Sequence, residues 1–127
     1  MEKKKRIYIA DDEINMRRIV KDFLVRDGYI VETFENGSLL LDKFKKKPAD
    51  LVMLDVMMPG ANGYAVCKEI RKTSTVPIIM LSARDSDLDY ATALNLGSDD
   101  YFTKPFSMIE LSMRVNSIFR RIEYSKQ

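Results

Sequence analysis

Histidine is absent from this chain of 127 residues. Its absence excludes Ser-His and Cys-His nucleophilic catalysis, histidine metal ligands and a phosphohistidine carried by the chain itself. The chain has a single cysteine, Cys67, which excludes an intramolecular disulfide and fits a reducing compartment. The chemistry of this protein must therefore come from other side chains.

The sequence also lacks a long apolar segment and a strong charge bias. No apolar run reaches the length of a membrane span and none resembles a signal peptide, so we expect a cytoplasmic protein without membrane contact. The formal net charge is only +2, and the basic residues 3–6 form a short segment, so the chain alone is not expected to bind nucleic acid. The length suits one domain.

Five short apolar runs alternate with helix-like segments along the chain. We predict strands over residues 6–10, 29–34, 51–54, 77–81 and 100–103, each followed by a helix. Strict alternation of this kind predicts an α/β fold with a parallel sheet and helices on both faces. For five units we expect the flavodoxin-like three-layer (βα)5 sandwich with strand order 2-1-3-4-5.

The fourth predicted helix has a thin apolar stripe. Ser86 or Asp87 can cap it, and it should extend to about Leu96 before Gly97 ends it. Its stripe is expected to consist of Leu88, Ala91 and Leu94. We therefore predict that this helix is the least firmly docked of the five.

Polar residues stand where four of the predicted strands end. Asp11-Asp12, Asp55, Ser82 and Lys104 follow the first, third, fourth and fifth strands. Parallel strands bring their carboxyl ends to one edge of a sheet, so these side chains should converge. Taken singly, the acids could be helix caps, the serine a turn residue and the lysine a solvated side chain. These separate explanations do not account for the occurrence of all these residues at one edge of the sheet.

Such a cluster has the chemistry that phosphoryl transfer needs. Three neighbouring carboxylates repel one another and favour a hard divalent cation, Mg²⁺ or Mn²⁺. A carboxylate can accept a phosphoryl group, and a lysine ammonium and a serine hydroxyl can bind its oxygens. We therefore predict a phosphoacceptor site in which Asp55 is the nucleophile.

The chain resembles the receiver domain of bacterial two-component response regulators, most closely the winged-helix (OmpR/PhoB) class of transcription factors. The resemblance covers nearly the whole chain and is carried by four segments: residues 9–13 (IADDE), 54–60 (LDVMMPG), 81–84 (LSAR) and 99–106 (DDYFTKPF). It implies a phosphorylation-dependent signalling switch, not an enzyme with turnover, whose only reactions are self-phosphorylation and slow autodephosphorylation.

The resemblance also implies roles for individual residues. Asp55 would accept the phosphoryl group from a sensor histidine kinase. Asp12, Asp55 and the backbone carbonyl of Met57 would bind Mg²⁺, with Asp11 acting through a water molecule. Lys104, preceding a cis proline, would bind the phosphoryl group, while Ser82 and Tyr101 would change position on activation. Met57 and Arg84 flank the site, and we expect them to shield the acyl phosphate from water.

Phosphorylation is expected to favour a homodimer through the fourth helix, fifth strand and fifth helix. The residues that match the charged dimer face of the class are Asp99, Asp100, Glu110, Arg114 and Arg121. Opposite charges on one patch are self-complementary about a two-fold axis. Tyr90 and Asn95 depart from the class, because charged partners are usual at these two positions, and a weaker or altered dimer could result.

We expect a receiver domain over residues 1–122 and the start of a linker or tail over residues 123–127. No DNA-recognition element is present in the sequence, so DNA binding is expected through an effector domain outside this chain. A stand-alone receiver, acting through protein contacts or in a phosphorelay, is the alternative.

Two other classes fit less well. A Mg²⁺-dependent phosphohydrolase with an aspartyl nucleophile would need a second acid where Met57 stands, and a flavodoxin-like FMN carrier would need a phosphate loop in place of Asp11-Asp12.

Overall fold

The structure is a computed structural model that describes residues 3–83 and 86–126. Five strands and five helices alternate along it, as predicted. In chain order they are β1 (Arg6–Ala10), α1 (Ile14–Arg26), β2 (Ile30–Phe34), α2 (Gly37–Lys46), β3 (Leu51–Asp55), α3 (Gly63–Arg71), β4 (Ile78–Ser82), α4 (Asp87–Asn95), β5 (Asp100–Thr103) and α5 (Met108–Ser125). The predicted domain end at residue 122 lies within α5.

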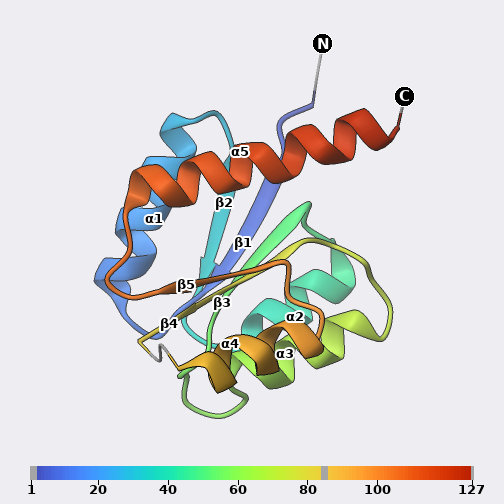
Figure 1. Cartoon of the computed structure of the whole chain (residues 1–127). Helices are drawn as coiled ribbons and strands as arrows, with labels where there is room; N and C mark the ends of the chain where they lie inside the picture. Colours follow the sequence, from blue (N-terminus) through green and yellow to red (C-terminus); the bar gives the residue numbers. More distant parts are fainter. Residues whose placement is uncertain (1–2, 84–85, 127) are drawn as a thin grey trace.

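The strands form one parallel sheet in the order β2-β1-β3-β4-β5, which confirms the predicted topology. Figure 1 shows the sheet between two helical layers, with α1 and α5 on one face and α2, α3 and α4 on the other. The register pairs Ala10 with Leu54, Asp55 with Leu81 and Ser82 with Thr103. The strands that carry the predicted site residues therefore end at the same edge.

Each face of the sheet has its own apolar core. Every residue of β3 and β4 is buried, which is the pattern that a continuous apolar run predicts for a central parallel strand. Alternate residues of these strands point to opposite faces: Val52 and Leu54 pack toward α2 and α3, whereas Leu51 and Met53 pack toward α1 and α5. The two cores hold the sheet edge in a fixed geometry.

Four helices begin at side-chain caps. The N-cap residues Asn36, Asn62, Ser86 and Ser107 each accept a hydrogen bond from the backbone N–H three residues later. Of the two caps predicted for the fourth helix, Ser86 and Asp87, the structure has Ser86. Gly97 ends α4 with a φ of 100°, a conformation that glycine adopts without strain.

The predicted inner face of α4 is wrong. Leu88, Ala91 and Leu94 are exposed, and Ala93 is the buried residue of the helix. Apolar residues are distributed around the whole circumference of this short helix, so their spacing does not determine one face. The small side chain of Ala93 fits against the neighbouring elements, and α4 remains a helix with little buried apolar surface.

Candidate functional site

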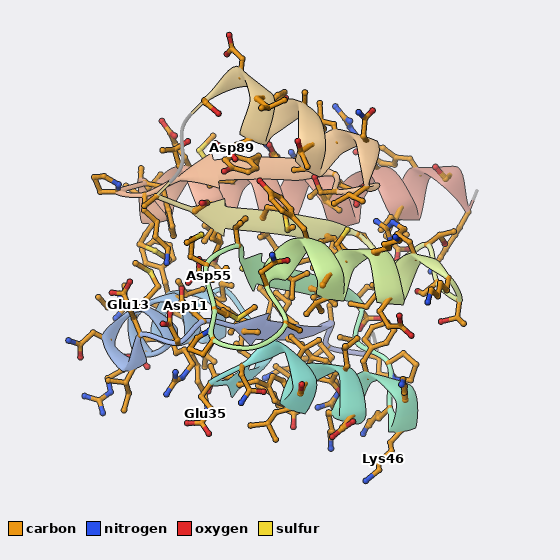
Figure 2. The ribbon with its side chains drawn as sticks, turned by 90° about the horizontal axis from the view of Figure 1, so that it is seen from below. Asp11, Glu13, Glu35, Lys46, Asp55 and Asp89 are labelled. Atoms are coloured by element: carbon orange, nitrogen blue, oxygen red, sulfur yellow. The ribbon has the colours of Figure 1, made fainter. Side chains whose placement is uncertain are left out.

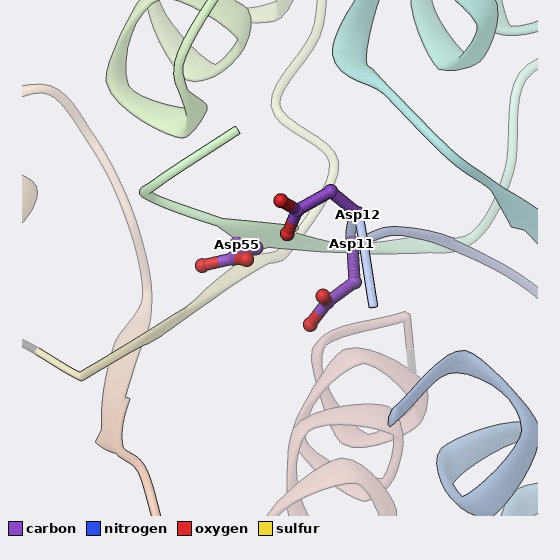
Figure 3. A group of neighbouring side chains, drawn as sticks. All are labelled: Asp11, Asp12 and Asp55. Carbon is purple, nitrogen blue, oxygen red and sulfur yellow. The ribbon is translucent and has the colours of Figure 1, made fainter. Parts of the chain in front are cut away.

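Three carboxylates converge at the carboxyl edge of the sheet. One oxygen from each of Asp11, Asp12 and Asp55 lies within 4.8 Å of the others. Asp11 and Asp55 are buried, whereas Asp12 is exposed. Figure 3 shows their carboxylates grouped between the ends of β1 and β3, and Figure 2 shows Asp11, Glu13 and Asp55 at one end of the sheet, away from Lys46. The predicted acidic cluster is therefore present.

Lys104 supplies a positive charge to this cluster. Its Nζ lies 2.9 Å from Oδ2 of Asp11 and 3.4 Å from Oδ2 of Asp55, and its side chain is only 13% exposed. The residue follows β5, and its backbone N–H donates to the carbonyl of Ser82 at 2.6 Å. The Lys104–Pro105 peptide bond is cis, as expected. Three carboxylates against one ammonium leave the site with excess negative charge.

Local backbone contacts orient the two buried acids. The N–H of Glu13 donates to Oδ1 of Asp11 at 2.9 Å, and the N–H of Met57 donates to Oδ1 of Asp55 at 3.2 Å. The loop after β3 turns at Gly60, where φ is 78°. It then returns over the strand end, and a Cβ on Gly63 would lie 2.5 Å from the carbonyl oxygen of Asp55. Glycine at position 63 therefore allows α3 to begin directly against the site.

Burial is the main cause of a raised carboxyl pKa in this cluster. Burial, followed by the charge of Asp11, raises the pKa of Asp55 to about 6, although Lys104 and the Met57 N–H act in the opposite direction. Burial lowers the pKa of Lys104, but its contacts with Asp11 and Asp55 outweigh burial and raise it. The ammonium is therefore firmly charged, while the Asp55 carboxylate is held in an unfavourable environment.

We expect Asp55→Asn to stabilise the metal-free protein. The folded state binds the Asp55 proton more tightly than the unfolded state, so its contribution to stability is lost as pH rises from about 4 to 6. The neutral amide avoids this loss. At pH 7 in EDTA, the free energy of unfolding should exceed that of the unsubstituted protein by about 2–3 kcal/mol.

Urea unfolding at several pH values between 4 and 7 measures this difference. Asp42→Asn, which removes an exposed carboxylate on α2, is the matched control and should change stability by less than about 0.5 kcal/mol. The difference in free energy of unfolding between Asp55→Asn and the unsubstituted protein should be larger at pH 7 than at pH 4. A difference that is equal at the two pH values would contradict this account of the site.

The other predicted switch residues lie beside the cluster. Ser82 is fully buried at the end of β4. Tyr101 is half-buried on β5, where its ring packs against the core under α2, α3 and α4 and meets the ring of Tyr90 edge-on at 6.1 Å. Met57 is 52% exposed beside Asp55. Arg84 lies outside the described residues.

Two contacts of the site were not predicted from the sequence. Arg17 of α1 donates to the backbone carbonyl of Asp11 at 2.6 Å, and Glu13 lies 3.8 Å from the Lys104 ammonium. Only their position in the sequence could have indicated these contacts, because both residues follow β1 within two helical turns and so lie at its carboxyl end. Composition alone marks them as ordinary surface charges.

The predicted dimer charges are partly engaged within the chain. Asp100 pairs with Arg114 at 2.8 Å, and Asp99 pairs with Arg71 at 3.1 Å. Arg121 borders a groove of about 540 Å³ beneath the C-terminal half of α5. Glu110 lies exposed in the first turn of that helix. The charges thus lie on neighbouring elements, but Asp99 and Asp100 already have partners.

The donor set at the edge suits a hard divalent cation. Carboxylate oxygens are the ligands that Mg²⁺ prefers, and Lys104 supplies one positive charge against three carboxylates. No helix in the described part of the chain has both the length and the apolar character to cross a bilayer.

Comparison with known proteins gives matches over most of the chain. A family model described as the response regulator receiver domain matches residues 7–116. The chain is 51% identical over 117 residues to the probable transcriptional regulator ycf27 of Cyanidium caldarium, covering 92% of this chain and 47% of that protein. It therefore spans about half the length of the curated relatives it matches.

Solved structures show the same likeness. Response regulator DrrB, described as a Thermotoga maritima OmpR/PhoB homolog, aligns with a TM-score of 0.87 and 31% identity, covering 94% of this chain and 54% of that chain. The BeF3-activated DrrB receiver domain aligns with a TM-score of 0.87 and 30% identity, covering 93% of this chain and 99% of that chain.

Proposed function

The chain belongs to the response regulator receiver domain family, whose general function is that of a phosphorylation switch, and we propose that Asp55 is its phosphoacceptor. The observation that carries this assignment is the buried carboxylate of Asp55, held between two further acids and the Lys104 ammonium. The likeness to the transcriptional regulator ycf27 and to DrrB, described as an OmpR/PhoB homolog, supports the OmpR/PhoB class.

The proposed reaction is a phosphoryl transfer from another protein. A carboxylate oxygen of Asp55 forms a bond to phosphorus, and the bond from phosphorus to a histidine nitrogen of a sensor kinase breaks. The electron pair of that bond stays on the nitrogen, which takes a proton from solvent, and the product is an acyl phosphate on Asp55. Because this chain has no histidine, the donor histidine lies outside it.

Asp12, Asp55 and the Met57 carbonyl would hold a Mg²⁺ or Mn²⁺ ion, with Asp11 acting through water. When bound, the ion supplies positive charge to the phosphoryl oxygens. Lys104 is suited to bind another phosphoryl oxygen, since its Nζ already lies 3.4 Å from Asp55. Met57 would shield the acyl phosphate with its side chain, and so would Arg84.

The switch itself would pass through the strands next to Asp55. Ser82 ends the neighbouring strand β4, and its hydroxyl would move toward the phosphoryl group. Tyr101 follows on β5, and it would turn further inward as Ser82 moves. Its ring already contacts Tyr90 of α4, so a change at Tyr101 would alter the docking of that helix.

The output would be a homodimer that controls a DNA-binding effector domain. The likeness to a transcriptional regulator of about twice the length supports this over a stand-alone receiver. In this role the protein is not a classical enzyme, its only reactions are its own phosphorylation and slow dephosphorylation, and it works in the cytoplasm with a sensor kinase as partner.

Beryllofluoride, a phosphoryl mimic, tests the switch by changing the oligomeric state. With Mg²⁺ and beryllofluoride the chain should elute as a dimer, and Asp55→Ala should remain a monomer. Arg121→Glu should also remain a monomer because it places like charges on the predicted face, whereas Lys72→Glu on α3 should dimerise normally. A dimer that forms equally with Asp55→Ala would contradict the proposed function.

A further inference from the structure

Helix α4 has little apolar surface to hold it in place. Ala93 is its buried residue, while Leu88 is 76% exposed and Leu94 is 44% exposed. A helix usually docks through an apolar stripe, and burial of one alanine side chain is a weak substitute. Polar contacts must therefore contribute to the position of α4.

The C-terminal end of α4 is fastened by one arginine from another helix. Arg71, the last residue of α3, donates from Nε and Nη2 to the carbonyl of Gly97, at 2.9 and 2.7 Å. Its Nη1 donates to the carbonyl of Val76 at 2.6 Å. Hydrogen bonds from a charged donor are stronger than neutral ones, and a planar guanidinium fixes direction as well as distance.

Asp99 closes this network. Its Oδ2 accepts from Arg71 at 3.1 Å and from the N–H of Ile78 at 2.7 Å, and its own N–H donates to the carbonyl of Ile78 at 2.7 Å. Gly97 allows the close approach, because a Cβ there would lie 2.9 Å from Nε of Arg71. The end of α4 is thereby joined to the end of α3 and to the first residue of β4.

The N-terminal half of α4 has contacts of a different kind. The hydroxyl of Tyr64 donates to the carbonyl of Asp89 at 3.3 Å, and Tyr90 meets Tyr101 edge-on. Tyr101 is the residue through which the switch would act. The N-terminal half of the helix therefore meets the proposed switch residue, whereas the C-terminal end is joined to α3 and β4.

We propose that Arg71 is a positioning residue of the switch, fixing the C-terminal end of α4 as a pivot while the N-terminal end moves. The proposal rests on the proposed function, since it concerns how phosphorylation at Asp55 changes α4. It also implies that Asp99 stays bound to Arg71 in both states.

Amide hydrogen exchange measured by NMR locates the movement. Near the N-terminus of α4, the N–H groups of Asp89 and Tyr90 bond to Ser86, and near the pivot those of Gly97, Ser98 and Asp99 bond to backbone carbonyls. On addition of Mg²⁺ and beryllofluoride, exchange at Asp89 and Tyr90 should change about threefold or more, while the three pivot amides stay within about twofold. An equal change at both ends would overturn the pivot.

Arg71→Gln tests the anchor without any phosphoryl mimic. The amides of Gly97, Ser98 and Asp99 should exchange about tenfold faster, because the Gly97 carbonyl and the Asp99 carboxylate lose their charged donor and the segment opens more readily. With beryllofluoride, the response should now extend to these amides. Arg71→Lys should give a partial effect, since an ammonium keeps the charge but lacks the fork of donors.

A matched control separates anchoring from a general loss of stability. Lys72→Gln removes the neighbouring exposed cation and should leave all these amides unchanged. In Arg71→Gln, the amides of β3 should change much less than those of residues 97–99. Unchanged exchange at residues 97–99 would overturn the anchor. If Arg71→Gln does not fold, the proposal is decided by the comparison of amide exchange at the two ends of α4 in the unsubstituted chain. Absence of any beryllofluoride response around Asp55 would contradict the proposed function and not the anchor.

Discussion

Lys104→Met should lower the free energy of unfolding by about 3 kcal/mol at pH 7 in EDTA, the lower end of the range for removing one partner from a buried ion pair. The Lys104 side chain is 13% exposed, and its ammonium contacts the buried carboxylates of Asp11 and Asp55. Without it these acids face each other with no neutralising charge. Urea unfolding measures the loss.

The loss should depend on pH and metal in a defined direction. Without Lys104 the folded carboxylates hold a proton more tightly than the unfolded ones, so stability should recover as pH falls and decline again as pH rises. Millimolar Mg²⁺ should restore part of the lost free energy of unfolding at pH 7. Lys72→Met, which removes an exposed lysine paired only with Glu69, should cost less than about 1 kcal/mol. Similar losses in the two variants would contradict the role of Lys104.

Asp12→Asn should reduce the affinity for Mg²⁺ by about 100-fold or more. Loss of a group that only supports a metal ligand costs about 10- to 100-fold in affinity, so loss of a ligand should cost at least the upper end of that range. Asp12 is the exposed acid of the cluster, so its removal disturbs no core contact. The metal-free variant should also be more stable than the unsubstituted protein, because one repelling charge is gone. Calorimetric titration with Mg²⁺ measures the affinity.

Glu13→Gln is the control for Asp12→Asn. Glu13 is the next acid along the chain, but it lies outside the three-carboxylate group and its side chain is 65% exposed. Its loss should change the Mg²⁺ affinity by less than about threefold, as expected for an exposed charge that is not a ligand. If Glu13→Gln and Asp12→Asn weaken binding equally, net charge and not ligation explains the affinity.

The fold was predictable because its central strands are continuous apolar runs between turn signals. The run 51–54 suits a strand buried on both faces, and β3 is fully buried. Once the sheet is parallel, the convergence of Asp11, Asp55 and Lys104 follows from the topology, since each residue ends a strand or directly follows one. The acidic cluster could therefore be predicted from the sequence.

What could not be predicted depends on contacts between distant segments. The inner face of α4 rests on Ala93, which no periodicity in a nine-residue helix singles out. Asp99 is predicted for a dimer face, and the additional pairing of its carboxylate with Arg71 of α3, 28 positions away in the sequence, was not predicted. The neighbouring element decides whether a surface charge has a partner within the chain, and no local sequence pattern indicates it.

Intact-mass analysis after incubation with Mg²⁺ and acetyl phosphate is the most direct test of the central claim. The chain should gain the mass of one phosphoryl group, the modification should be lost on alkaline treatment as an acyl phosphate, and Asp55→Ala should gain nothing. No mass gain in the unsubstituted protein, or an equal gain in Asp55→Ala, would contradict the assignment of Asp55 as the phosphoacceptor.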